Sequence, residues 1–305
     1  MKDYFARSVV GQEAVRKKLS YYVEVYYKTN IFRNCLFLAS KGGGKTLLAR
    51  TVGEKLGKRF VEVNAASIGK FDDFLDDIFI PFCMSQPVTL FIDEIHALNK
   101  KVEDFLLSVL APNASNRNIV RFRGGTTIID FRLFTFLSAS TEPQKIFPAL
   151  KNRLENIIFG RYSRSELMQI LTIGAGHIDI DPQALDFFMD RCKYNARFVA
   201  ELGKEVQNFA LVKNVKEINL SMAKELIGLL GLYESGLSKL ELEILESLSQ
   251  SPASSLTRLA AKHGLTPSAA RNLELELLAH DLIEINNGRR LTMPGRQYLE
   301  RNLKK

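Results

Sequence analysis

The sequence predicts an α/β fold in which helices cover both faces of a parallel sheet, followed by two smaller parts. Three observations predict it. Short apolar segments alternate with helical patterns through the first half of the 305 residues, as they do in parallel α/β sheets. A glycine-rich loop occupies residues 39–46, directly after one apolar segment, and an acidic pair at 93–94 ends another. The order of segment, loop and helix matches a phosphate-binding motif.

The expected elements of this first part follow from its apolar runs. Continuous apolar residues indicate strands that are buried on both faces. Strands joined by helices are expected to be parallel, with right-handed crossovers. The expected strands are 35–38, 60–63, 88–92, 133–138 and 156–159, and the expected helices begin at Glu13, Lys45, Phe71, Lys101 and Gln144.

The loop at 39–46 has the composition of a phosphate-binding loop. Its three consecutive glycines let the backbone adopt unusual φ/ψ values and turn N–H groups inward. A helix expected from Lys45 to Leu56 adds the partial positive charge of its N-terminus. The Lys45 ammonium is expected to reach the β- and γ-phosphates, and the Thr46 hydroxyl to bind Mg²⁺. The residues expected to hold ATP or ADP here are Gly42, Gly43, Gly44, Lys45 and Thr46.

Ala39 stands where the loop pattern usually opens with glycine. Alanine is compatible with that position if its φ angle is negative, so we interpret it as a tolerated variant. Taken alone, the loop has a simpler interpretation as a glycine-rich turn beside a lysine. The strand before it and the helix after it favour the phosphate-binding interpretation.

The acidic pair predicts the metal and water chemistry of nucleotide hydrolysis. Leu90–Ile92 form the apolar centre of a buried strand, and Asp93 and Glu94 follow at its carboxyl end. Asp93 is expected to hold Mg²⁺ through its waters, and Glu94 to polarise the attacking water. Alone, the pair is equally consistent with a solvated strand end, and the upstream loop favours the catalytic interpretation.

Other polar residues fit the same chemistry. Ser140 and Thr141 follow an apolar strand, and if that strand neighbours 88–92, one of them lies near the γ-phosphate as an uncharged donor. Arg153 is expected to act on a phosphate held by a neighbouring subunit, although cations are common at helix C-termini for dipole reasons alone. Arg197 begins a helix, where a cation is unfavourable without an anion nearby. A bound phosphate would account for it.

Composition places the chain among ordinary soluble globular proteins. Hydrophobic residues make up 46% and charged residues 25%. No run of about 18 apolar residues predicts a transmembrane helix, and the N-terminus lacks the apolar stretch of a signal peptide. Cys35, Cys83 and Cys192 have neither metal-site spacing nor a disulfide pattern. This cysteine usage favours a reducing cytoplasm.

The basic balance of the chain, a formal net charge of +8, favours a polyanionic partner such as DNA. Residues 286–305 carry six basic residues and one acidic residue, Glu300, so this short tail holds more than half of the net charge. A solvated surface tail is the alternative. The basic residues are Arg289, Arg290, Arg296, Arg301, Lys304 and Lys305, and the candidate DNA contacts among them are Arg289, Arg290 and Arg296.

Three domains are expected. The second is predicted to be small and all-helical, with Gly231–Gly236 as a hinge. The third has helical patterns at 255–263 and 267–280, followed by a hairpin centred on 286–288. Helix, turn, helix and hairpin in this order predict a winged helix, whose second helix and wing contact DNA. The expected boundaries are 1–160, 161–235 and 236–305.

A second hairpin is expected at Asn118–Phe131, with its turn at Gly124-Gly125. The alternation of Ile119 and Arg121 with Val120 suits a half-exposed ribbon. Such a ribbon either contacts DNA or a partner protein, or it only extends the edge of the fold.

Taken together, these motifs resemble those of the RuvB family of AAA+ ATPases, the bacterial motors of Holliday junction branch migration, along nearly the whole chain. The segment Phe91–Asn99 is especially similar to the family. Val10-Gly11-Gln12 resembles the motif that flanks the adenine, and Ser138–Thr141 resembles sensor 1. Leu150–Arg153 resembles the arginine-finger box, and Ala196–Ala200 resembles sensor 2.

The resemblance implies an α/β P-loop AAA+ ATPase core, a small helical lid domain and a C-terminal winged helix. It implies ATP or ADP with Mg²⁺, with Val10 beside the base. It also implies a hexameric ring around duplex or four-way junction DNA, in which hydrolysis drives translocation during recombination and repair. A RuvA-like protein would bind the Asn118–Phe131 hairpin.

Three features depart from the family and indicate a divergent member. Lys151 replaces an arginine of the finger box and lacks its bidentate fork. The hairpin does not follow the usual sequence, and the N-terminus lacks the usual Arg-Pro.

Two alternative functions remain open. The first is a non-processive AAA+ ATP switch, acting as a DNA-bound loader or recruiter with slow turnover. The second is a winged-helix DNA-binding protein that binds nucleotide only for assembly. The intact Glu94 disfavours the second, because a binding-only site needs no water-activating carboxylate.

Overall fold

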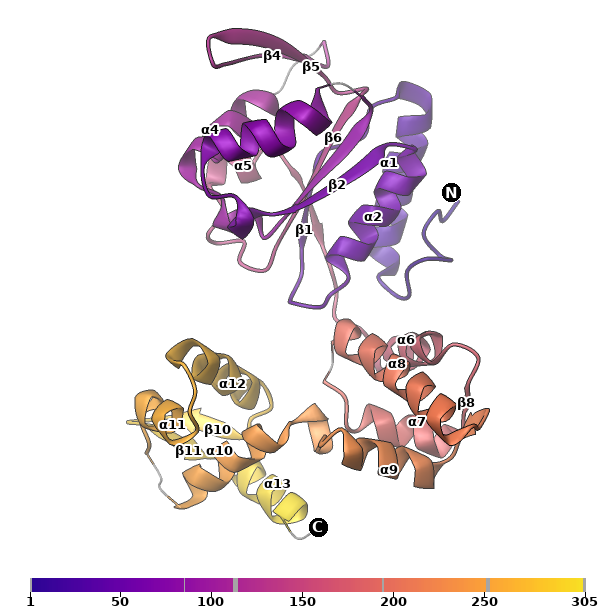
Figure 1. Cartoon of the computed structure of the whole chain (residues 1–305), viewed down its shortest axis with the longest axis vertical. Helices are drawn as coiled ribbons and strands as arrows, with labels where there is room; N and C mark the ends of the chain where they lie inside the picture. The colour runs from indigo at the N-terminus through magenta and orange to yellow at the C-terminus, as the bar shows by residue number, and fades with distance from the viewer. Residues whose placement is uncertain (1, 85, 112–114, 194, 251–252, 304–305) are drawn as a thin grey trace. The chain divides into compact units, whose positions relative to one another are not determined.

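The computed structural model describes residues 2–303 except 85, 112–114, 194 and 251–252. The chain divides into two compact units (Figure 1). Unit 1 comprises Met1–Glu166 with Asn195–Arg197, and unit 2 comprises Leu167–Tyr194 with Phe198–Lys305. Lys304 and Lys305, predicted above as part of the basic tail, lie outside the described residues.

Unit 1 is built on a five-stranded sheet with the strand order β2-β3-β6-β1-β7. All neighbouring strands in it are parallel. The five strands predicted from the apolar runs are confirmed to within two residues at each end. Their bounds are β1 Cys35–Leu38, β2 Arg59–Asn64, β3 Val88–Asp93, β6 Phe134–Ser140 and β7 Glu155–Ile158.

Burial explains why most residues of β3 and β6 are apolar. Every residue of β6 is buried, and β3 is buried up to Asp93, because each has a neighbour on both sides and helices above and below. β2, at the edge, alternates between exposed and partly buried residues.

Helices cover both faces of the sheet (Figure 1). One face packs against α1 (Glu13–Thr29) and α2 (Lys45–Leu56), and the opposite face packs against η2 (Phe74–Cys83) and α4 (Lys100–Val109). Two separate hydrophobic cores result, one on each side of the sheet. The predicted fold class is confirmed for this unit.

Two predicted helices differ from expectation. The helix expected at Gln144 begins only at Pro148, as α5 (Pro148–Lys151). Phe147 precedes this proline and has the extended ψ of 120°, because a residue before proline is disfavoured in the helical region. The helix at Phe71 has one α-helical turn, α3 (Phe71–Asp73), and then widens into the π-helix η2, which contains Pro81.

The predicted hairpin before β6 is present. It consists of β4 (Arg117–Phe122) and β5 (Gly125–Asp130), paired antiparallel. The turn lies one residue before the predicted Gly124-Gly125, because Gly125 already pairs with Phe122. Its residues Arg123 and Gly124 both have positive φ, 49° and 72°, as a two-residue turn of this twist requires.

Four helices follow the sheet, in the part of the chain predicted to be helical. Asp181 caps the second helix by accepting the N–H groups of Gln183 and Ala184. The helices are α6 Arg164–Ala175, α7 Pro182–Met189, α8 Ala196–Lys213 and α9 Leu220–Leu229. The all-helical expectation was wrong in one detail: β8 (Asp179–Ile180) pairs with β9 (Glu217–Ile218). The segments that lead into α7 and α9 run in parallel and share hydrogen bonds, which a helical periodicity does not reveal.

The C-terminal part of unit 2 has the predicted helix–helix–hairpin order. The structure adds a helix that the sequence patterns missed, α13, which begins at Met293 directly after the hairpin. Tyr298 and Leu299 of α13 are buried against the preceding elements. The elements are α10 Lys239–Gln250, α11 Leu256–Lys262, α12 Pro267–Ala279, β10 Ile283–Ile285, β11 Arg289–Leu291 and α13 Met293–Leu303.

Two further expectations concern the whole chain. Cys35, Cys83 and Cys192 are all buried, and none of the three forms a disulfide bond. Within the described residues, no helix is long and apolar enough to cross a membrane.

Candidate active site

The predicted site lies at the carboxyl edge of the parallel sheet. The glycine-rich loop follows β1, the acidic pair follows the apolar part of β3, and Ser140 ends β6. β6 lies between the other two strands and pairs with both. Because parallel strands end at the same edge, these three chain segments meet there.

The loop has the backbone geometry that its glycines predict. Gly42 and Gly44 have φ angles of 77° and 88°, which residues with a side chain rarely adopt. Ala39 is not among the described residues with positive φ, which meets the condition set for an alanine at this position. A Cβ atom on Gly43 would approach that of Ala39 to 2.9 Å, so the middle glycine is required sterically.

Lys45 is held inside the loop by backbone oxygen atoms. Its Nζ donates to the carbonyl oxygens of Ala39 at 3.0 Å and Ser40 at 3.2 Å. The residue is only 7% exposed, and Thr46 follows it in the first turn of α2. Burial lowers the pKa of the Lys45 ammonium, against the opposing effect of the nearby carboxylates at 93 and 94. A buried ammonium held by neutral oxygens is suited to bind an anion such as a phosphate.

The acidic pair occupies a strained turn. Glu94 has a φ of 51°, a left-handed conformation that is uncommon for a residue with a side chain and frequent at functional sites. Asp93 accepts the N–H of Glu94 at 3.0 Å. Burial raises the pKa of the Asp93 carboxyl, so a bound cation would offset the cost of its charge.

The structure brings Thr141 directly to Glu94. The Thr141 N–H and its hydroxyl both donate to Oε2 of Glu94, at 3.1 and 3.0 Å. The hydroxyl Oγ of Ser140, the other candidate, forms a hydrogen bond with Nδ1 of His96 at 2.9 Å. Sequence reasoning did not identify His96 or Glu142 as site residues. Their only signal in the sequence was position, because His96 follows the acidic pair closely and Glu142 follows Thr141.

Arg197 lies near the same edge. Burial is the main cause that raises the pKa of Asp93 and lowers that of Lys45; the Arg197 charge opposes the first shift slightly and adds slightly to the second. The backbone N–H of Arg197 donates to Oδ1 of Asn195 at 2.9 Å, and Nδ2 of Asn195 donates to the carbonyl oxygen of Lys41 at 2.9 Å. Asn195 therefore links the start of α8 to the glycine-rich loop, a role that sequence reasoning did not find.

The N-terminal motif reaches the loop through the segment after β7. Gln12 forms two hydrogen bonds with the backbone of Gly160, at 2.8 and 2.9 Å. Tyr162, two residues further, donates to the carbonyl oxygen of Gly43 at 3.3 Å. Val10, two residues before Gln12, is partly buried.

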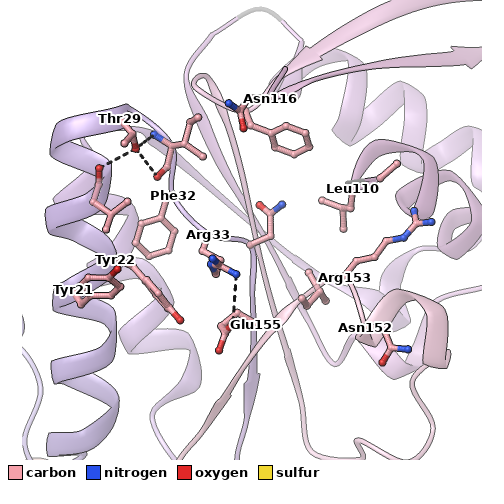
Figure 2. Close-up of a pocket in the computed structure, with 16 residues that line it drawn as sticks. Tyr21, Tyr22, Thr29, Phe32, Arg33, Leu110, Asn116, Asn152, Arg153 and Glu155 are labelled. Atoms are coloured by element: carbon pink, nitrogen blue, oxygen red, sulfur yellow. Dashed lines mark hydrogen bonds and ion pairs between the residues drawn. The ribbon is translucent and has the colours of Figure 1, made fainter. Parts of the chain in front are cut away.

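Arg153 lies at the opposite edge of the sheet. It precedes Glu155, the first residue of β7, which is in register with Cys35 at the start of β1. Arg153 lines a cavity of about 740 Å³ together with Tyr22 and Arg33 (Figure 2). Its Nη1 is buried and has no hydrogen-bond partner among the described residues. Arg153 and the glycine-rich loop of one chain are therefore at different ends of the sheet.

The C-terminal arginines divide into two kinds. Arg289 donates through Nε and Nη2 to Oε2 of Glu274, at 3.1 and 2.9 Å, and Glu274 is buried. The Arg289 guanidinium thus compensates a buried carboxylate, which favours a structural role for it over the expected DNA contact. Arg290 and Arg296 are exposed and remain candidates.

The β4–β5 hairpin has one exposed apolar pair. Ile119 and Ile128 face each other across the two strands and are 69% and 61% exposed. Val120, on the other side of the ribbon, is buried. The exposed pair is the only pair of directly opposed apolar residues with this exposure in the described part of the hairpin.

The comparisons with known proteins agree with this geometry. Residues 35–162 match the family described as "ATPase family associated with various cellular activities (AAA)". The chain is 26% identical over 311 residues to the Holliday junction branch migration complex subunit RuvB of Mycoplasmopsis pulmonis, covering 96% of this chain and 95% of the relative. It is 28% identical over 280 residues to the protein of the same name from Nitratiruptor sp., covering 90% and 81%.

Solved structures show the same fold. The Thermotoga maritima RuvB Holliday junction branch migration motor superposes with a TM-score of 0.77 at 23% identity, over 98% of this chain and 99% of that one. A point mutant of the same Thermotoga maritima protein gives a TM-score of 0.77 at 24% identity, over 96% of each chain.

Residues 35–162 thus carry an AAA ATPase domain, whose parallel sheet presents the glycine-rich loop and the acidic pair at one edge. Within this class the chain is RuvB-like, since relatives of that kind match it over most of its length.

Proposed function

We propose that this chain is an ATP-driven DNA motor that moves duplex DNA and drives branch migration of Holliday junctions. The proposal rests on one observation above all: the similarity to RuvB subunits of the Holliday junction branch migration complex extends along 96% of the chain. A relationship confined to the ATPase domain would suit many other functions. Here it also includes the C-terminal elements.

The proposed hydrolysis follows from the geometry of the carboxyl edge. Lys45 and the loop N–H groups bind the β- and γ-phosphates, and Val10 lies beside the base. Thr46 and Asp93 would hold Mg²⁺, which neutralises phosphate charge when bound. Glu94 accepts a hydrogen bond from the attacking water and orients it toward the γ-phosphate. Thr141 holds the Glu94 carboxylate at this place through its two hydrogen bonds.

Arg197 would contact the phosphates from the start of α8. Its effect on the pKa of both Lys45 and Asp93 supports a position near the nucleotide. A cation at a helix N-terminus is favoured there only when an anion offsets it.

Arg153 would act on the nucleotide of a neighbouring subunit. Its place at the amino edge of the sheet supports action in trans, because the glycine-rich loop of the same chain is at the other edge. Its buried Nη1 lacks a partner among the described residues, and an unpaired donor is costly until a phosphate oxygen satisfies it. This arrangement requires a ring of subunits, which we propose to be a hexamer.

The C-terminal elements would contact the DNA backbone. We assign residues 1–160 to the large ATPase domain, 161–235 to a helical lid and 236–305 to a winged helix. The exposed Arg290, in the hairpin, and Arg296, in α13, would neutralise phosphates. The exposed pair Ile119 and Ile128 of the β4–β5 hairpin suits an apolar contact with a RuvA-like protein.

The competing function is an AAA+ ATP switch that loads or recruits without processive movement. Steady-state ATPase activity with and without duplex and four-way junction DNA distinguishes the two, with Glu94→Gln as the blank. Strong stimulation by DNA is expected for the motor. Slow hydrolysis that is indifferent to DNA would contradict the motor and favour the switch.

A further inference from the structure

A histidine beside Glu94 has no part in the reaction described above. His96 lies in the short helix η3 (Ile95–Ala97) that follows β3, and its side chain is 13% exposed. Nδ1 of its ring is 2.9 Å from Oγ of Ser140 and 3.3 Å from Oε2 of Glu94. Nε2, on the other side of the ring, is 3.3 Å from Oε1 of Glu142.

Oε2 of Glu94 is therefore surrounded by contacts from two directions. Thr141 donates to it twice from the end of β6, and His96 Nδ1 faces it from η3. A glutamate has several rotatable bonds, and fixing them costs conformational entropy. Contacts made before the nucleotide arrives remove that cost from the reaction.

The ring of His96 is itself fixed by neighbours. Ser140 Oγ accepts the N–H of Glu142 at 3.0 Å and contacts Nδ1 of the ring. Glu142 contacts Nε2 through its side chain and is in turn paired with Lys145 at 2.7 Å. The ring thus joins η3 to the segment after β6, and both its nitrogen atoms face polar groups.

We infer that His96 is a positioning residue for ATP hydrolysis. Its Nδ1 holds the Glu94 carboxylate against Thr141, while Ser140 and Glu142 hold the ring. The inference rests on the proposed ATPase function and assigns no contact between His96 and the nucleotide. The orientation of the water-activating carboxylate then depends on Ser140, at the end of β6, and on Thr141, which follows it.

Three substitutions of His96 separate the two sides of the ring. In His96→Asn, the side-chain amide nitrogen takes the place of Nδ1, which faces Glu94. In His96→Gln, it takes the place of Nε2, which faces Glu142. His96→Ala removes both. The measurements are kcat and KM for ATP in the presence of duplex DNA, on the full-length protein.

For His96→Ala we expect kcat to fall about 10- to 100-fold, the usual loss when a supporting contact to a reacting group is removed. KM for ATP is expected to stay unchanged, because the contacts of Lys45 and the glycine-rich loop are not altered. His96→Asn should recover most of the lost kcat, and His96→Gln should not. If His96 only supported folding, His96→Asn and His96→Gln would be expected to lower kcat equally.

His177→Ala is the matched control, since His177 is an exposed histidine in unit 2 and should leave kcat unchanged. If the wild type is active, two results would overturn the inference on His96 and leave the proposed function intact. These are an unchanged kcat in His96→Ala, or equal activity in His96→Asn and His96→Gln. A wild type that binds ATP but never hydrolyses it would overturn the proposed function. The ¹⁵N NMR shift of His96 Nδ1 tests the contact without turnover: Glu94→Gln should move it, and an unmoved signal would contradict the contact.

Discussion

Lys45 of unit 1 and Arg289 of unit 2 are held in opposite ways. In unit 1, Lys45 is buried and donates to backbone carbonyl oxygens, with no carboxylate at ion-pair distance among the described residues. In unit 2, Arg289 is paired with the buried carboxylate of Glu274. A cation held by neutral oxygens keeps its charge for a ligand, whereas a paired one has already been compensated. The group that an arginine or lysine contacts, and not its residue type, therefore indicates whether its charge is available to bind a ligand.

Arg153 and Arg290 extend the comparison. Arg153 has a buried nitrogen atom without a hydrogen-bond partner in the described structure, which resembles the uncompensated state of Lys45. Arg290 is adjacent to Arg289 in β11 but is exposed and lies opposite Glu284. Two neighbouring arginines in one strand are thus expected to have different uses.

The largest effect is expected for Arg153→Ala. Loss of a guanidinium that stabilises the transferring phosphate lowers kcat about 10³-fold or more, while ATP binding by the same subunit should persist. Mixing this variant with Lys45→Ala, which should not bind ATP, tests the direction of action. Partial recovery of ATPase activity in the mixture is expected, because Arg153 of one subunit then meets the nucleotide of another. Mixtures as inactive as their components would contradict action in trans.

A somewhat smaller effect is expected for Glu94→Gln. Without a carboxylate to polarise the water, kcat should fall about 10²- to 10³-fold, and ATP should remain bound because Lys45 and the loop are intact. The measurement is single-turnover hydrolysis with recovery of unhydrolysed, bound ATP. Normal turnover would exclude Glu94 as the base.

Arg289→Ala should change stability and leave DNA binding nearly unaltered. Removing one partner of a buried ion pair lowers the free energy of unfolding by about 2–3 kcal/mol, because Glu274 then keeps Arg271 as its one cationic partner among the described residues. Denaturant unfolding of the full chain measures this. Adding Glu274→Gln should restore part of the loss, because it removes a buried charge that Arg271 alone compensates only in part. A double variant no more stable than Arg289→Ala would contradict the explanation.

The smallest effect is expected for Arg290→Ala. One lost phosphate contact reduces the slope of log K against log salt concentration by about 0.9, with unchanged unfolding. Arg290→Lys, which keeps the charge, should retain the slope. An unchanged slope in Arg290→Ala would place the DNA contact elsewhere, and the same measurement on Arg296→Ala would follow.

The strands and the phosphate-binding loop of unit 1 could be predicted because their signals are local. A continuous apolar run such as that of β3 identifies a buried strand within a few residues, and Gly42 and Gly44 adopt the backbone angles that only glycine tolerates readily. The prediction failed at the helix expected from Gln144, where Pro148 excludes a helical residue before it. It also failed at α13, where an isolated pair of buried residues, Tyr298 and Leu299, gives a weak apolar pattern.

The sequence by itself determined the α/β class, the five strands of the sheet and the candidate residues Lys45, Asp93 and Glu94, since these follow from apolar runs and from motifs of adjacent residues. Only the tertiary structure decided that Thr141 and His96 contact the Glu94 carboxylate, and that Arg289 forms an ion pair with Glu274. The physical reason is that such contacts join side chains from different elements. Strand order and burial decide which side chains come into contact, and the spacing of residues along the chain predicts neither.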